Sequence, residues 1–257
     1  MSPLLLLIPI LFALGGKKSS SSSATRVSNV FVRSGPVPAF QTPFDVSAGN
    51  AFRAGAPFAS YAAIDAAIGK SNFGSTRPAF VEVEGGGKRY PTKEEAATGG
   101  TRKHLGRDIY FPPGTPIFAP EAGRITAKGQ VHLHTTNMSG KTFTTPQGKV
   151  HRTDEELYGW AIALQVSRGN DYRFLHLDKA SVTPKGAGDT VAAGEYLGRV
   201  VAAPTMASAR AHLHLEAHKD TYDTNGKLLS RGPAIEPLGD AMINVHEFNI
   251  LCGRGSQ

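Results

Sequence analysis

The residues best suited to chemistry are four histidines and one aspartate, which lie in three short motifs. His104 and Asp108 belong to the run His-Leu-Gly-Arg-Asp, His176 to Phe-Leu-His-Leu, and His212 and His214 to Ala-His-Leu-His-Leu-Glu. Two histidines and one carboxylate fill three positions of a tetrahedral zinc ion and leave the fourth open, as in catalytic zinc sites. Two further histidines then remain to handle protons and charge. The pattern predicts a metal-dependent hydrolase.

The period of a β-strand explains how the last motif can present its histidines. In the run 211–217 the polar residues alternate with apolar ones, so the two kinds of side chain point to opposite faces of a strand. We expect Leu213 and Leu215 to be buried in the core while His212 and His214 project together into a groove.

The same alternation is expected around His176. It places Phe174 and His176 on one face of a strand, and Leu175 and Leu177 on the other. Three histidines would then meet on one surface without exposing the leucines that face the core.

The first motif is less decisive on its own. His104 and Asp108 have a spacing that would put both on one face of a helix. However, Gly106 and the turn Pro112-Pro113-Gly114 favour a loop that runs into a strand. We therefore expect a loop followed by a strand.

Other histidines are weaker candidates. His132 and His134 form a second His-x-His pair and are rival ligands, although a solvated strand or hairpin is the simpler interpretation. His151, His218 and His246 belong to no motif, and we expect them at the surface.

Beyond residue 100, apolar runs punctuated by glycine and proline are typical of short strands. The chain as a whole has 29 glycines and 17 prolines, which favours many turns. We predict a mainly β fold, with an antiparallel β-sheet groove or an open, barrel-like sandwich and short flanking helices. The expected strands are 108–111, 116–119, 123–127, 160–166, 172–177, 191–201 and 211–217.

The preceding segment carries one helical pattern. Phe58, Tyr61, Ile64 and Ile68 recur at helical spacing, and Gly69 follows as a stop signal. This predicts one short amphipathic helix packed on the core, with partner binding as the alternative. Residues 80–84 alternate as a strand does, and glycines then end the pattern.

Residues 3–16 form an apolar stretch that Pro9 interrupts. A membrane-spanning helix needs about 20 apolar residues, so the length suits the apolar region of a secretory signal. However, no basic residue precedes the stretch, whereas Lys17 and Lys18 follow it. A retained segment that associates with a membrane or virion is the alternative. We therefore expect an envelope location, periplasmic or extracellular, or alternatively a phage virion.

Charge and cysteine content set further bounds. The net charge of +7 and pI near 9.5 suit an anionic polymer such as peptidoglycan or teichoic acid, or serve solubility. Because no dense basic run with interleaved aromatic residues occurs, we expect no nucleic-acid partner. Cys252 is the only cysteine, which excludes an intramolecular disulfide.

The motifs together resemble a known family. His-Leu-Gly-Arg-Asp-Ile, followed by Pro-Pro-Gly-Thr-Pro-Ile-Phe-Ala-Pro and Gly-Arg-Ile, is similar to the first signature of the lysostaphin/LytM-type zinc metallopeptidases. Phe-Leu-His-Leu resembles their isolated catalytic histidine, and Ala-His-Leu-His-Leu-Glu their His-x-His signature. Residues 232–238 resemble their closing segment, so the likeness extends over about 101–238 with the motifs in the family's order.

This resemblance implies a β-sheet groove with zinc at its floor and cleavage of peptide bonds in bacterial peptidoglycan. It assigns His104, Asp108 and His214 as ligands of one zinc ion per chain, and His176 and His212 as the catalytic pair. Zinc would polarise the scissile carbonyl and activate a water molecule. One histidine would take the water's proton, and the other would stabilise the oxyanion or protonate the leaving amine. Which histidine acts as the base stays open.

With the resemblance in place, the chain divides into five segments. These are a hydrophobic signal or membrane-active segment (1–16), a serine-rich linker (17–24), an N-terminal extension with one short helix (25–100), a zinc metallopeptidase domain (101–240) and a C-terminal tail (241–257). The sequence departs from the family pattern in three places. The loop 203–210 lacks the usual glycines, residues 130–156 are a long polar insertion that would wall the groove, and residues 96–100 lack a tyrosine that some relatives have.

Three other functions compete with a peptidoglycan endopeptidase. A non-catalytic LytM-like regulator of other cell-wall hydrolases is disfavoured by the complete set of five motif residues. A virion-associated phage protein that carries the lytic domain for envelope penetration is favoured by the N-terminal segment. A phosphohistidine carrier shares a similar strand arrangement but has no need for Asp108.

Overall fold

The computed structural model of the chain describes residues 46–83, 87–89, 91, 93–130, 142–144, 150–152, 159–166, 169–201, 211–223 and 228–254. Several sequence-based predictions lie outside these residues: the hydrophobic segment 1–16, the linker 17–24, the pair His132 and His134, and the loop 203–210. Among the helices that are described, none is long and apolar enough to cross a membrane.

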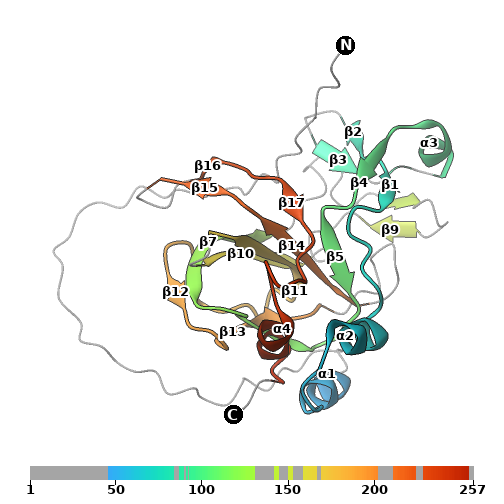
Figure 1. Ribbon diagram of the computed structural model, residues 1–257. Coiled ribbons are helices and arrows are strands. Elements are labelled where there is room, and N and C mark those ends of the chain that lie inside the picture. The colour runs from blue at the N-terminus through green and yellow to red at the C-terminus, as the bar shows by residue number, and fades with distance from the viewer. Residues whose placement is uncertain are drawn as a thin grey trace. The chain divides into compact units, whose positions relative to one another are not determined.

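One antiparallel sheet forms the centre of the fold (Figure 1). Its strands follow the order β12 (Thr190–Val191), β7 (Gly123–Gln130), β10 (Trp160–Val166), β11 (Asp171–Leu177), β14 (Leu213–His218) and β17 (Ala234–Ile235). A further strand, β5 (Gly106–Ile109), pairs with the first part of β14. Because β14 lies between β11 and β5, it brings distant parts of the sequence together.

The strands at the centre of the sheet form for the reason their sequence indicates. The run Trp-Ala-Ile-Ala-Leu-Gln-Val of β10 is almost wholly buried, and Ile162 and Leu164 have no exposed surface. Such a continuous apolar strand needs neighbours on both sides, and β10 pairs with both β7 and β11. The strands expected over 160–166 and 172–177 are therefore both present, and they pair with each other.

Smaller pairs of strands surround the sheet. They are β1 (Thr76–Pro78) with β4 (Thr101–Lys103), β2 (Val81–Val83) with β3 (Gly87–Arg89), β6 (Pro116–Phe118) with β13 (Tyr196–Arg199), β8 (Thr142–Thr144) with β9 (Val150–Arg152), and β15 (Thr221–Tyr222) with β16 (Leu228–Ser230). The described strands form no closed barrel. The predicted mainly β, antiparallel fold is therefore confirmed.

The single strand expected over 191–201 is two strands, β12 and β13. A turn separates them, and Gly194 in that turn has a φ of 76°, which is the left-handed region that glycine favours. The break lets β12 join the central sheet while β13 pairs with β6.

Four short helices are described: α1 (Val46–Arg53), α2 (Tyr61–Ile68), α3 (Lys93–Thr98) and α4 (Val245–Leu251). Helix α2 is the one that the apolar spacing predicts. The Ser60 side chain caps its N-terminus, Gly69 ends it with a φ of 92°, and Ile64 and Ile68 are buried in the core.

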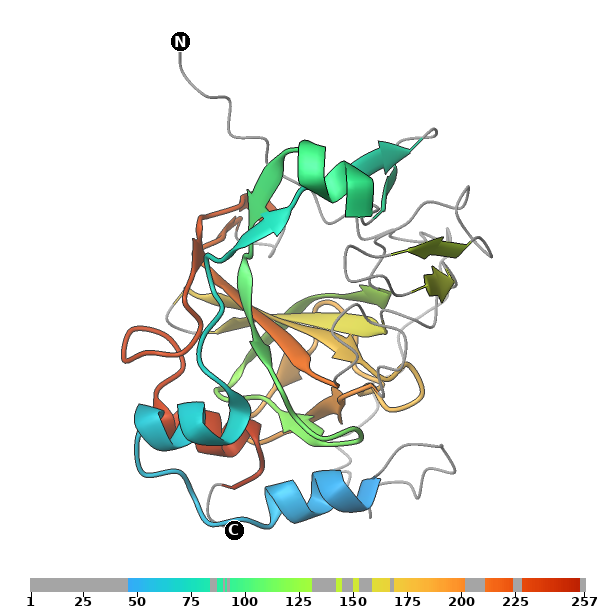
Figure 2. The ribbon, with the colours of Figure 1, turned by 90° about the vertical axis from the view of Figure 1, so that its right-hand side faces the viewer.

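Helices α2 and α4 lie side by side in both views (Figures 1 and 2). Phe58, just before α2, packs on Phe248 of α4, and Phe248 in turn packs on Phe111. The segment 241–257, expected as a tail, thus contains a helix whose Phe248 is fully buried. Likewise, the extension 25–100 contains three helices where periodicity indicates one.

Candidate metal centre

Strand register brings the first and last motifs together. Asp108 of β5 lies directly opposite His214 of β14, although 106 residues separate them in sequence. Leu213 and Leu215, on the opposite face of β14, have no exposed surface, as the alternation predicts. The spacing of strands in a sheet therefore places the carboxylate beside the imidazole.

One oxygen of Asp108 is the focus of the site. Its Oδ1 atom lies 2.9 Å from His214 Nδ1, 3.3 Å from His104 Nε2 and 3.6 Å from His212 Nε2. His176 completes the group, because its ring centroid lies 5.0 Å from that of His212. The structure thus gathers all five residues that the sequence singles out.

Three of the five form a set that suits a metal ion. One ligand atom each from His104, Asp108 and His214 can be chosen so that all lie within 4.8 Å of one another. A tetrahedral ion with bonds of about 2.0–2.1 Å holds its ligand atoms roughly 3.3 Å apart. The separations of 3.3 Å and 2.9 Å at Asp108 Oδ1 are close to that value, and two imidazole nitrogens with one carboxylate oxygen are zinc ligands.

Each histidine in this set has its other ring nitrogen occupied. His214 Nε2 lies 3.1 Å from Glu216 Oε1, and His104 Nδ1 donates to the Asn72 carbonyl oxygen at 3.2 Å. A ligating histidine usually donates its second N–H in this way, which fixes the orientation of the ring. His214 Nδ1 and His104 Nε2 are therefore the nitrogens available to a metal.

The carboxylates on either side of His214, those of Asp108 and Glu216, both have lowered pKa values. Burial raises the pKa of Asp108, but hydrogen bonds from His104 and His214 outweigh burial and hold this pKa well below its usual range. Burial likewise opposes the charge on His214, yet its hydrogen bonds to Asp108 and Glu216 raise the pKa of His214 to about 9. The two carboxylates therefore favour positive charge on the His214 ring that lies between them.

Gly106 makes room for the His214 ring. A Cβ atom at this position would lie 2.8 Å from His214 Nε2 and 2.5 Å from the Leu215 carbonyl oxygen. Both distances are shorter than real Cβ contacts, so only glycine lets β5 approach β14 this closely. The sequence shows this glycine as a loop signal, whereas the structure gives it a role in packing β5 against the His214 ring.

His176 reaches the site by a different route from the predicted alternation. Phe174 and Leu177 are both buried in the core, so the expected shared face of Phe174 and His176 is wrong. The register between β10 and β11 shifts next to His176, and His176 has a φ of 68°. Such a bulge reverses the alternation and redirects a side chain. It turns His176 toward His212 while Leu177 returns to the core.

Behind the candidate ligands lies a buried ionic network. Arg173 of β11 forms ion pairs with Asp171, Glu216 and Asp220, the last of these very short. His218 Nε2 lies 3.1 Å from Glu216 Oε2 and His218 is 3% exposed, so its expected place at the surface is wrong. His218 is two residues beyond Glu216 on β14 and therefore shares its face. His246 is exposed, as expected.

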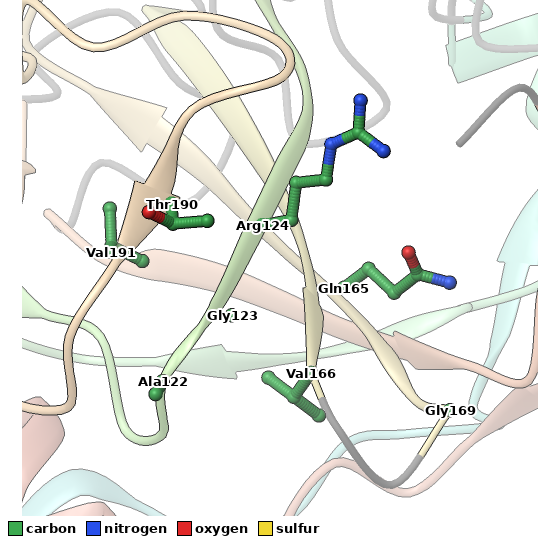
Figure 3. Close-up of a pocket in the computed structure, with 8 residues that line it drawn as sticks. All are labelled: Ala122, Gly123, Arg124, Gln165, Val166, Gly169, Thr190 and Val191. Atoms are coloured by element: carbon green, nitrogen blue, oxygen red, sulfur yellow. The ribbon is translucent and has the colours of Figure 1, made fainter. Parts of the chain in front are cut away.

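A pocket elsewhere on the sheet holds none of these groups. It lies at the Val166 end of β10 (Figure 3). His176 is near the other end, because its neighbour Leu177 pairs with Trp160. The residues that line the pocket are Ala122, Gly123, Arg124, Gln165, Val166, Gly169, Thr190 and Val191. No histidine or carboxylate is among them, so this pocket offers no comparable chemistry.

Sequence reasoning missed Asn72 and the role of Glu216. Glu216 continues the polar face of the His-x-His strand, and that alternation was its signal. Asn72 lies 32 residues before His104, the first residue of the first motif, and no spacing rule indicates its role.

Comparisons with known proteins agree with the motifs. Residues 135–227 match the model of peptidase family M23. The matched region contains His176, His212 and His214, while His104 and Asp108 precede it. A comparison with curated protein sequences gives no match.

Three solved structures illustrate the similarity. LytU is 22% identical over 65% of this chain and 82% of its own, with a TM-score of 0.31. The catalytic domain of lysostaphin from Staphylococcus simulans is 22% identical over 63% and 87%, with a TM-score of 0.32. A zinc-containing peptidase from Vibrio cholerae is 17% identical over 65% of this chain but 36% of its own, with a TM-score of 0.35.

The family match covers the motifs that carry His176, His212 and His214, and the fold gathers them with the residues of the first motif. The resemblance to the lysostaphin/LytM-type peptidases found in the sequence is confirmed, because residues 135–227 match peptidase family M23.

Proposed function

We propose that this peptidase is a zinc-dependent endopeptidase that cleaves peptide bonds in bacterial peptidoglycan. One zinc ion per chain would be held by His104 Nε2, one oxygen of Asp108 and His214 Nδ1. The observation that carries the proposal is the convergence of these atoms on one point, with the second nitrogen of each histidine already engaged.

When bound, zinc would supply a Lewis acid that polarises the scissile carbonyl and lowers the pKa of a water molecule toward ~7. The protein supplies the proton transfers. His176 and His212 form a neighbouring pair beside the ligands, and both are at least nine-tenths buried. One imidazole of this pair would take the proton of the attacking water, and the other would stabilise the oxyanion or protonate the leaving amine.

The substrate class rests on the family. Lysostaphin is described as an antimicrobial peptidase, and a LytM-type relative as a glycyl-glycine endopeptidase. The basic net charge of +7 suits a surface that binds the anionic cell wall.

We further propose a location in the cell envelope, periplasmic or extracellular, or alternatively in a phage virion. Residues 3–16 would associate with the membrane or with the particle. Detection of the uncleaved chain in purified particles would support the virion alternative.

The test combines metal analysis with digestion of defined peptidoglycans. The purified chain should contain about one zinc per molecule, and mass analysis of the released fragments should show cleaved peptide bonds. A chelator and His214→Ala should each stop the release, because both remove the metal. His246→Ala, which replaces an exposed histidine of α4, is the matched control and should remain active. Cleavage by zinc-free protein would contradict the mechanism. A chain that binds zinc but cuts no peptidoglycan would instead support a regulator.

A further inference from the structure

A turn ahead of the first motif is docked on His104. Residues 72–75 form this turn, in which the Ser75 N–H donates to the Asn72 carbonyl at 3.2 Å and Gly74 has a φ of 69°. A glycine with positive φ at the third position is what a type II turn requires. The Gly74 N–H donates to the His104 carbonyl and the His104 N–H to the Ser75 carbonyl, both at 2.9 Å. The turn therefore holds the main chain of a metal ligand from both sides.

The side chain of Asn72 holds the second ligand. Its Oδ1 accepts the main-chain N–H of Asp108 at 2.9 Å, and its Nδ2 donates to Asp108 Oδ2 at 2.8 Å. Arg77 adds a longer contact of 3.4 Å to the same Oδ2. One oxygen of the carboxylate is thereby occupied from the side of the extension. The other oxygen, Oδ1, faces the three histidines.

The main-chain carbonyl of Asn72 acts on His104 as well. It accepts from His104 Nδ1 at 3.2 Å, while Nε2 of the same ring points to Asp108 Oδ1 at 3.3 Å. A single residue thus sets the ring orientation of one ligand and the carboxylate orientation of another. Asn72 itself is only half-buried, so these hydrogen bonds, rather than core packing, are what it contributes.

We propose that Asn72 is a positioning residue of the metal centre, supplied by the segment that precedes the peptidase motifs. By occupying Asp108 Oδ2, it restricts Asp108 to a single-oxygen ligand and preserves the open fourth position that catalysis needs. The inference rests on the proposed zinc-dependent function and adds to it a residue outside the family's motifs.

Loss of the Asn72 side chain should weaken zinc binding by about 10- to 100-fold, the usual effect of removing a group that orients a metal ligand. The Asn72→Ala variant tests this by competition for zinc with a chromophoric chelator, without any peptidoglycan. Its main-chain carbonyl remains, so only the hydrogen bonds to Asp108 are lost. Thermal unfolding of the metal-free forms shows whether the variant is folded.

Asn244→Ala is the matched control. The Asn244 side chain caps α4, and its loss should cost about 1 kcal/mol of stability. Because the hydrogen bonds of the Asn244 side chain lie within that cap, zinc affinity should not change. A second readout uses Co²⁺ in place of zinc. If Asp108 is freed to bind with both oxygens, the visible absorption of the Asn72→Ala complex should weaken, as expected when a four-coordinate Co²⁺ ion gains a ligand.

The outcomes separate the two proposals. Zinc binding by the unaltered chain that falls in Asn72→Ala but not in Asn244→Ala supports the positioning role. Equal affinity and equal Co²⁺ spectra in the unaltered chain and Asn72→Ala would overturn the positioning role alone. Absence of zinc binding by the unaltered chain would overturn the proposed function, and the positioning role with it.

Discussion

Gly106 lies between His104 and Asp108 in sequence and against the His214 ring in space. A methyl group at this position would meet the His214 ring and the Leu215 carbonyl oxygen. The carbonyl belongs to the backbone of a central strand and cannot move aside cheaply. At the residue scale, close packing of β5 on β14 is therefore part of the site.

We expect Gly106→Ala to lower the free energy of unfolding by about 1–3 kcal/mol, the typical cost of overpacking, and also to weaken zinc binding. Gly239→Ala is the control, because a Cβ there has nothing within 4 Å. Denaturant unfolding and zinc competition measure the two effects. Unchanged zinc affinity in Gly106→Ala would show that the His214 ring can shift without loss of function.

His176 is the only described residue other than glycine with a positive φ. The left-handed region costs an L-residue about 1–2 kcal/mol. At this position glycine should therefore be better tolerated than alanine, and His176→Gly should be more stable than His176→Ala by about 1 kcal/mol. Both variants should lose peptidase activity, because both lack the imidazole.

A helical position provides the comparison. Ala66 is exposed within α2, and Ala66→Gly should lose about 1 kcal/mol, the opposite preference. Denaturant unfolding gives both differences. If the protein with glycine is less stable than the protein with alanine at both positions, His176 carries no backbone strain.

The sequence identifies the five residues that the structure gathers, because each sits in a motif with recognisable spacing. It fails where geometry comes from outside the motifs. The alternation rule correctly predicts that His176 lies at the site, but the reason is different. A bulge, which no residue pattern indicates, changes which side chains of β11 share a face. The role of Asn72 cannot be predicted from the sequence, because it depends on a turn that packs against residues far along the chain.

At the scale of elements, α2 links the extension to two other parts of the molecule. Arg107, within the first motif, forms a short ion pair with Asp65 of α2 and donates to the Gly69 carbonyl at the end of the helix. Tyr61, at its start, donates to Asp240 Oδ1 at 3.0 Å. The helix thus holds β5 on one side and the segment before α4 on the other.

The contact between Tyr61 and Asp240 should make the free energy of unfolding depend on pH in the alkaline range. Burial and the hydrogen bond to Asp240 raise the pKa of Tyr61 to about 12, from 10.0. A raised pKa stabilises the folded protein fully below pH 10, and this contribution is lost as the pH rises toward 12. The stability difference between the unaltered chain and Tyr61→Phe should therefore narrow over that range.

Ultraviolet titration of the phenol and denaturant unfolding at several pH values measure this effect. Asp240→Asn should bring the pKa of Tyr61 back down, because it removes the carboxylate that opposes ionisation. A Tyr61 phenol that titrates near pH 10 in the unaltered chain would contradict the link between α2 and the segment before α4.

Elements with a strong period are predictable, and the others are not. The apolar run of β10 and the spacing of α2 appear in the structure with nearly the expected bounds. Helix α4 has only seven residues, too few for a clear period, although its Asn244 and Glu247 form a capping box that marks a helix start. The strand expected over 191–201 shows that a turn inside an apolar run can divide it.

At the scale of the whole molecule, the extension and the motif-bearing region share one core. Ile64 and Ile68 of α2 belong to the same buried cluster as Ile109 of β5, Leu213 of β14 and Phe248 of α4. The side-chain amide of Asn249 pairs with the main chain of Phe58 through hydrogen bonds of 2.7 Å and 2.9 Å. A boundary near residue 100 therefore marks where the motifs begin, but the described core extends across it.

This shared core allows the stability of the fold and the binding of metal to be separated. Because zinc would bind the folded chain, free zinc at 100 times its dissociation constant should raise the free energy of unfolding by about 2.7 kcal/mol. The His214→Ala variant should lack this stabilisation by zinc, since it removes a ligand.

Ile64→Ala should lower stability by about 2–5 kcal/mol through loss of buried volume, with zinc or with chelator. Zinc should nevertheless raise the free energy of unfolding of Ile64→Ala by the same amount, because Ile64 contacts the core rather than the ligands. Denaturant unfolding of the three proteins with zinc and with chelator measures all these quantities. If Ile64→Ala also lost the stabilisation by zinc, α2 would have to be counted as part of the metal centre rather than as its support.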